Sequence, residues 1–228
     1  MKKLVLGTAI PALVAVLAPN QVQAATFTQI GDTGETLSTA QVIPSGPLPL
    51  NSISGTISET TPGADLFQIY LTGGNTFSAT TATNPGTLTD PELFLFDSSG
   101  KGVYADDDAS PDTKQAALPV GNSPTQSGTY YLAISGFDYH PVSARGNIFP
   151  DYPDVPFAGV RGPTGSGGGS SLSGFDGPRL NGGSYNITLT GVQTSAQAVP
   201  EPSSVLGILA FGFWGATALL KNKNSKQM

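Results

Sequence analysis

The chain has 228 residues, and its 29 Gly and 19 Pro favour an all-β protein with long loops. It contains no Cys, which excludes disulfides, thiolate zinc sites, iron–sulfur clusters and cysteine nucleophiles. Its 10 Lys and Arg are outnumbered by 16 Asp and Glu, an acidic balance that argues against a nucleic-acid partner.

The first 24 residues have the three parts of a secretory signal peptide. Two lysines precede an apolar stretch over residues 4–17, and small residues follow it up to Ala24. A membrane-spanning helix is the less favoured interpretation, because the stretch is short and Pro11 interrupts it. We therefore expect a signal-peptide helix over residues 1–24, export through the secretion machinery and cleavage near Ala24.

The body, residues 25–198, has the pattern of short strands separated by turns. Several segments alternate between apolar and polar residues; for example, Phe67, Ile69 and Leu71 share one face of their segment. No segment has the period of a helix. We predict an all-β fold, a single antiparallel β-sandwich of jelly-roll type. The expected strands are residues 27–30, 53–57, 65–71, 76–82, 92–97, 102–105, 128–136 and 184–191.

Two of these strands carry further expectations. Residues 65–71 and 76–82 are separated by the turn residues Gly73, Gly74 and Asn75, which predicts a β-hairpin. Residues 92–97 are apolar on both faces, as expected of a strand in the centre of a sandwich.

Residues 137–183 differ from the rest of the body because they are rich in Pro and Gly and lack a strand pattern. A strand pattern resumes afterwards, so this segment is interpreted as an insertion into one sandwich. Mobility is expected at residues 165–171, which are almost entirely Gly and Ser. The insertion contains aromatic residues that we expect to attach it to the sheet, namely Tyr139, Phe149, Tyr152, Phe157 and Phe175.

Residues 199–228 contain three features in a fixed order. The sequence Val199, Pro200, Glu201, Pro202 precedes an uncharged apolar run, residues 205–220, and a lysine-rich end. The run predicts a transmembrane helix with its lysines on the cytoplasmic side. Together the three parts resemble the PEP-CTERM sorting signal of Gram-negative bacteria. This resemblance implies transient anchoring in the inner membrane, processing by an exosortase-like membrane protease, and delivery to the cell envelope or extracellular matrix.

The body resembles a second family. The elements are Asp65-x-Phe67, the run over residues 93–100 that ends in Asp97-x-x-Gly100, the triple aspartate at residues 106–108, and residues 128–136. In this order they look like the bacterial pre-peptidase C-terminal (PPC) domain, a small β-sandwich appended to secreted proteins. The insertion at residues 137–183 departs from that pattern.

The acidic residues supply the candidate metal site. Asp106 and Asp108 are expected to share one face of an extended segment while Asp107 points oppositely. Carboxylates in loops are ligands that Ca²⁺ prefers, so one interpretation is a calcium site formed by Asp106 and Asp108 with Asp65, Asp90 or Asp97. The EF-hand spacing fails, because Pro111 stands where Gly is required. The other interpretation is a solvated turn kept soluble by its charge.

The sequence gives little support for catalysis. His140 is unique and lies outside any nucleophile motif, so we expect no enzymatic activity. The leading hypothesis is an exported protein that binds or scaffolds exopolysaccharide or envelope proteins, with or without calcium. The alternatives are an accessory domain or cryptic hydrolase that acts on extracellular polymer, and a passive matrix component.

Overall fold

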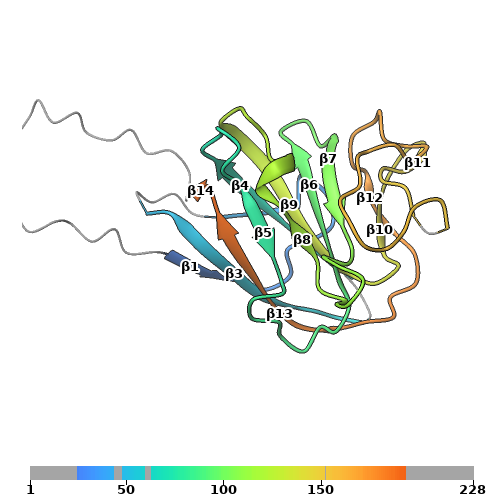
Figure 1. The fold of residues 1–228 in the computed structure, drawn as a ribbon, viewed down its shortest axis with the longest axis horizontal. Helices are drawn as coiled ribbons and strands as arrows, with labels where there is room; N and C mark the ends of the chain where they lie inside the picture. The colour runs from blue at the N-terminus through green and yellow to red at the C-terminus, as the bar shows by residue number, and fades with distance from the viewer. Residues whose placement is uncertain (1–24, 44–47, 60–62, 152, 194–228) are drawn as a thin grey trace, which may run out of the picture.

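A computed structural model describes residues 25–43, 48–59, 63–151 and 153–193, and this part of the chain is almost entirely β-structure (Figure 1). Its one helical element is a 3₁₀ turn, Val120–Asn122, so the predicted all-β class is confirmed. No helix within these residues is long and apolar enough to span a membrane. The expected signal-peptide helix, the sorting motif, the C-terminal helix and Tyr152 lie outside the described residues.

Two larger sheets and one small sheet make up the fold. The first sheet, sheet A, has its strands in the order β1 (Ala25–Thr28), β3 (Leu50–Ile57), β13 (Gly183–Thr190), β5 (Ser78–Thr80) and β8 (Ala117–Leu118). Pairing is antiparallel except between β1 and β3, which run parallel.

The second sheet, sheet B, positions the candidate site. Its strands are β14 (Val192–Gln193), β4 (Ala64–Leu71), β9 (Gly128–Gly136), β6 (Pro91–Asp97) and β7 (Gly102–Asp106), in that order. A further strand, β2 (Gln41–Val42), pairs in parallel with β4. The small sheet lies inside the insertion and contains β11 (Gly146–Asn147), β10 (His140–Ser143) and β12 (Gly174–Asp176).

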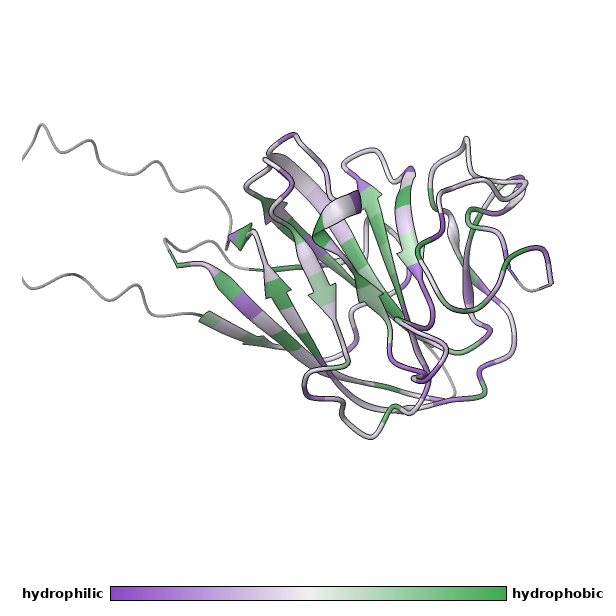
Figure 2. Cartoon of the chain, in the orientation of Figure 1, coloured by the Kyte–Doolittle hydropathy of each residue, from purple (hydrophilic) through white to green (hydrophobic). Residues whose placement is uncertain are grey.

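Sheets A and B pack face to face as in a β-sandwich. Ile53 and Ile187 of sheet A share a fully buried cluster with Phe67 and Leu132 of sheet B. This cluster also holds Phe67, Ile69 and Leu71, the predicted inward set of β4, so the face assigned to that strand is confirmed. Figure 2 shows the corresponding alternation of hydrophobic and polar bands along the strands.

The predicted hairpin between residues 65–71 and 76–82 is wrong. Strand β4 pairs with β9 in sheet B, whereas β5 pairs with β13 and β8 in sheet A. Gly73, Gly74 and Asn75 all have positive φ, and they carry the chain from one sheet to the other. The turn residues were recognised correctly, but a turn between strands does not by itself make the strands partners.

The insertion covers the outer face of sheet B, and we call residues 137–182 the cap. Phe94 of β6 points into the cap, with its ring centroid 5.7 Å from Phe149 and 6.0 Å from Phe175. Phe96 packs against Phe149 in the same cluster. Strand β6 is therefore apolar on both faces because Leu93 and Leu95 face sheet A while Phe94 and Phe96 face the cap.

The segment expected to be mobile, residues 165–171, has a defined course in the cap. The amide of Gly165 donates to the Ile148 carbonyl at 3.1 Å, and the amide of Gly167 donates to the Asn147 carbonyl at 2.8 Å. A Cβ at Gly168 would collide with the carbonyl of Pro163. Gly165, Gly167 and Gly168 are therefore required for close backbone approach, whereas the abundance of glycine had suggested a linker.

The two ends of the described body lie next to each other. The amide of Ala25 donates to the Pro49 carbonyl at 2.9 Å, and Pro49 forms a β-bridge with Gln193. Strand β14 pairs with the Leu71 end of β4, whereas the Ala64 end aligns through β9 with the start of β6. Figure 1 shows β1 and β14 on the left and the small sheet of the cap on the right.

Candidate functional site

The most acidic part of the fold lies where β6 begins and β7 ends. These strands are antiparallel, with Leu93 opposite Asp106, so residues that precede β6 meet residues that follow β7. The register therefore gathers four carboxyl groups at one end of sheet B. We call this set the acidic edge, and its members are Asp90, Glu92, Asp107 and Asp108.

The acidic edge is compact and largely buried. One carboxylate oxygen from each of Asp90, Asp107 and Asp108 lies within 4.8 Å of the other two. Glu92 is 1% exposed and Asp107 is 2% exposed. Among the described residues, Asp107 Oδ1 and Glu92 Oε2 are buried and have no hydrogen-bond partner. Buried polar atoms in proteins are nearly always paired, so these two oxygens call for an explanation.

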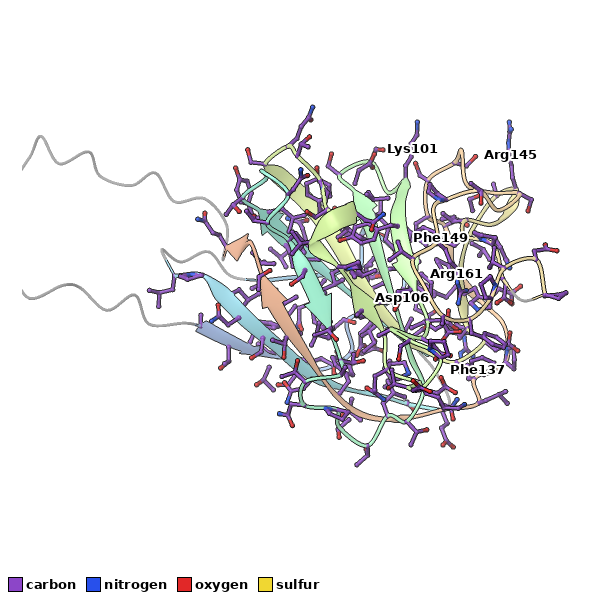
Figure 3. All side chains as sticks on the ribbon, viewed as in Figure 1. Lys101, Asp106, Phe137, Arg145, Phe149 and Arg161 are labelled. Atoms are coloured by element: carbon purple, nitrogen blue, oxygen red, sulfur yellow. The ribbon has the colours of Figure 1, made fainter. Side chains whose placement is uncertain are left out.

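Arg161 of the cap compensates part of this charge. Its backbone pairs with Ala105 of β7 in both directions, at 2.8 and 2.9 Å, which fixes its position. Its guanidinium Nη2 lies 3.1 Å from Asp107 Oδ2, and its side chain is 5% exposed. Figure 3 shows Arg161 and Phe149 on the cap side of the molecule, beside β7.

Lys114 meets the acidic edge from the solvent side. Its ammonium pairs with Asp90 Oδ2, although 71% of its side chain is exposed. The same ammonium lies 5.7 Å from the centroid of the Phe137 ring. Arg161 is therefore a fixed cation at the acidic edge, and Lys114 is a flexible one.

Burial controls the ionisation of the carboxyl groups near this edge. It raises the pKa of Asp107, and the nearby charge of Glu92 adds to the rise while Arg161 opposes it. Burial also raises the pKa of Asp106 to about 7, against hydrogen bonding from the Ala117 amide. Both groups therefore keep their protons up to a higher pH than an exposed aspartate does.

His140 of β10 connects the cap to the acidic edge. Its Nε2 lies 3.1 Å from Glu92 Oε1, and its Nδ1 lies 3.5 Å from Asp151 Oδ2. Burial lowers the pKa of His140, but the hydrogen bond and charge of Glu92, with Asp151 and Asp138, outweigh it and raise the pKa. Both ring nitrogens thus face carboxylates, as suits a charged imidazolium.

The predicted calcium ligands are only partly brought together. Asp90 and Asp108 belong to the acidic edge. Asp106 instead accepts a hydrogen bond from the Ala117 amide at 2.7 Å. Asp65 lies between sheets A and B, where Tyr185 donates to it at 2.7 Å. Asp97 closes its own turn by accepting from the Ser99 amide at 2.8 Å.

Sequence reasoning missed Asp107, Glu92 and Arg161. Asp107 was expected to point away from Asp108, but β7 ends at Asp106, so strand alternation does not extend to Asp107 and Asp108. The sequence did contain a signal for Glu92. Acidic residues lie at the start of β6 and at the end of β7, and a short turn joins these two strands.

A second feature of the cap is a polar hollow of about 540 Å³. It lies in the part of the cap formed by β11 and the glycine-rich segment, remote in sequence from the acidic edge. The polar side chains among its lining residues are Asn147, Asp151, Asp154, Thr164 and Ser166. These groups offer amide, hydroxyl and carboxylate partners for a hydroxylated ligand.

No protein-family model matches this chain, and no curated protein matches it either.

Proposed function

We propose that this protein is an exported, non-catalytic binding module of the cell envelope or extracellular matrix. In this proposal a jelly-roll-like, PPC-like sandwich is delivered by a PEP-CTERM-like tail and an exosortase-like protease, and its cap binds exopolysaccharide. The observation that supports it most is the placement of the cap on the outer face of sheet B, on the opposite side of the molecule from the meeting point of the body's two ends (Figure 1).

The separation between β14 and the cap has a functional consequence. Strand β14 stands at one end of the strand order of sheet B, and β7, whose Ala105 pairs with Arg161 of the cap, stands at the other. A tail that begins after Gln193 leaves the body beside β14. While that tail is held in a membrane, the cap faces away from it and towards surrounding polymer.

The side chains favour binding over turnover. Asp106 and Asp107, two of the carboxyl groups with raised pKa, are each 2% exposed and thus shielded from a polymer chain. Both nitrogens of His140 face carboxylates, which disfavours a role as the base of a serine nucleophile. The hollow in the cap, by contrast, presents the exposed residues Asn147 and Asp154.

Removal of polar groups from the hollow tests the proposed binding. The Asn147→Ala/Asp154→Ala double variant should lose about tenfold or more of its retention on the producing organism's exopolysaccharide, because two hydrogen-bonding groups are lost. Asp112→Ala is the matched control, since Asp112 is an exposed carboxylate outside the hollow. Equal retention of all three proteins would contradict a binding role for the hollow, and no retention of any would favour a passive matrix component.

The proposed sorting is tested by the intact mass of protein recovered from medium and from membranes. We expect the recovered protein to lack residues 1–24 and the region after the motif at Val199, with or without added glycan mass. Replacing Pro200 and Pro202 by Ala should leave residues 205–228 in place and hold the chain in the membrane fraction. Retention of those residues in the unaltered protein would contradict exosortase-like processing.

A further inference from the structure

We propose that the acidic edge binds one Ca²⁺ ion between Asp90, Asp107 and Asp108. The site lies at the junction of sheet B and the cap. The inference deepens the proposed function by giving the module a cation that fixes its binding face. The role of that cation in matrix binding rests on the proposed function. It replaces the ligand set expected from the sequence, in which Asp106, Asp65 and Asp97 took part.

The first support is the geometry of the oxygens. Ligands of a Ca²⁺ ion lie 2.3–2.6 Å from it, so two ligands of one ion are separated by at most about 5 Å. The three oxygens from Asp90, Asp107 and Asp108 satisfy this limit, because all lie within 4.8 Å of one another. Ca²⁺ takes six to eight oxygens, so bidentate carboxylates and water would complete the shell.

The second support is independent of the clustering. Asp107 Oδ1 and Glu92 Oε2 are buried side-chain oxygens without a hydrogen-bond donor among the described residues. Their residues are 2% and 1% exposed, so bulk water does not replace the missing partner. A buried acceptor left unpaired costs about 1–3 kcal/mol, and more when charged. A cation satisfies such lone pairs without needing a donor proton.

The known partners leave these same atoms open. Arg161 occupies Oδ2 of Asp107, while His140 and the Asp138 amide occupy Oε1 of Glu92. The second oxygen of each carboxylate therefore remains for another ligand. The competing explanation is that Asp107 is protonated and needs no cation, and the test below distinguishes the two.

Lys114 marks the route by which the cation enters. Its ammonium now pairs with Asp90, but 71% of its side chain is exposed, whereas that of Asp90 is 7% exposed. The ammonium can therefore move into solvent when a cation takes its place at the buried carboxylate. Lys114 thus acts as a weak internal competitor for the proposed site.

Cation binding would also tighten the cap. Asp107 is held to the cap by Arg161, and Glu92 is held to it by His140. An ion that joins Asp107 to Asp90 and Asp108 connects the start of β6, the end of β7 and the cap contact made by Arg161. The cap that carries the hollow would then be fixed more firmly on sheet B when Ca²⁺ is bound.

Calorimetric titration of Ca²⁺ into the chelator-treated full-length chain in detergent tests the site. We expect one ion per chain with a Kd of about 10⁻⁴–10⁻³ M, the range of extracellular calcium modules. Asp90→Asn should weaken binding about tenfold or more, whereas Asp112→Asn, an exposed carboxylate two residues from Lys114, should leave it unchanged. Lys114→Met should strengthen binding about threefold or more, because it removes the competitor without touching a ligand.

The opposite results would overturn the proposal. No binding heat at millimolar Ca²⁺, or equal binding by Asp90→Asn and Asp112→Asn when both have the circular dichroism spectrum of the unaltered chain, would exclude the site. If no binding heat is seen, a proton that the unaltered chain releases on titration and that Asp107→Asn does not release would identify a protonated Asp107 instead. If retention on exopolysaccharide is the same with and without chelator, matrix binding does not require the ion. The proposed function would then hold independently of the proposed Ca²⁺ site.

Discussion

Replacement of Arg161 by Met should lower the free energy of unfolding by about 3–5 kcal/mol, because it leaves the buried carboxylate of Asp107 without its cation. The guanidinium is 5% exposed, so water does not take its place. It also donates to the Phe157 carbonyl at 3.2 Å, a bond inside the cap that is lost as well. Urea unfolding of the chelator-treated chain measures the change, and Arg145→Met, an exposed arginine of the same cap, should cost less than about 0.5 kcal/mol.

The loss of unfolding free energy in Arg161→Met should grow as pH rises. Ordinary acid denaturation has the opposite direction, because it lowers stability as pH falls. Asp107 has a raised pKa in the folded state, so the fold binds a proton that the unfolded chain releases above its ordinary value of 3.8. Stability from this group is therefore greatest at low pH and is lost as pH rises through the folded pKa. Asp106, with a folded pKa of about 7, adds a loss of the same sign between about pH 4 and 7.

Without Arg161 the pKa of Asp107 rises further. At acidic pH the Asp107 carboxyl of the Arg161→Met variant is therefore protonated, which removes the cost of a buried negative charge without its cation. We expect its penalty at pH 5 to be about half or less of that at pH 8. The Asp107→Asn/Arg161→Met double variant should recover most of the loss at pH 8. An equal penalty at both pH values would show that packing and the carbonyl bonds of Arg161, and not the charge of Asp107, account for the effect.

Strand alternation predicted much of the sandwich because it is a local property of the chain. Phe67 with Ile69, and Ile187 with Leu189, reach the core between sheets A and B as their spacing indicates. The pairing of strands is not local, which is why the hairpin of β4 with β5 was predicted incorrectly. The short strands of the cap also escaped prediction, since two to four residues carry no usable period.

The candidate site was harder to predict because its partners come from distant segments. Asp90 and Asp108 were identified as candidates by residue type alone. Bringing them together requires the register of β6 on β7, and adding Arg161 requires the course of the cap. The sequence contains no local signal for that course, so the buried partner of Asp107 was found only in the structure.

Replacement of Phe94 by Ala should lower the free energy of unfolding by about 3–5 kcal/mol and loosen the cap selectively. Phe94 is 2% exposed and lies between Phe149 and Phe175, so its loss leaves a cavity under the cap. The neighbouring variant Leu95→Ala should cost a similar 2–5 kcal/mol, because Leu95 is fully buried between sheets A and B. The two variants therefore remove adjacent side chains from opposite faces of the same strand.

Amide hydrogen exchange distinguishes these faces, because structural units can open independently of global unfolding. In Phe94→Ala, the amides of Gly165 and Gly167, which bond within the cap, should exchange faster by a larger factor than those of β13. In Leu95→Ala, cap and β13 amides should accelerate by similar factors, since the core shared by both sheets is weakened. Equal acceleration of cap and β13 in Phe94→Ala would mean that the cap opens only with the sandwich. Its hollow would then be a rigid extension of sheet B, and cation binding at the acidic edge would have no separate cap motion to restrain.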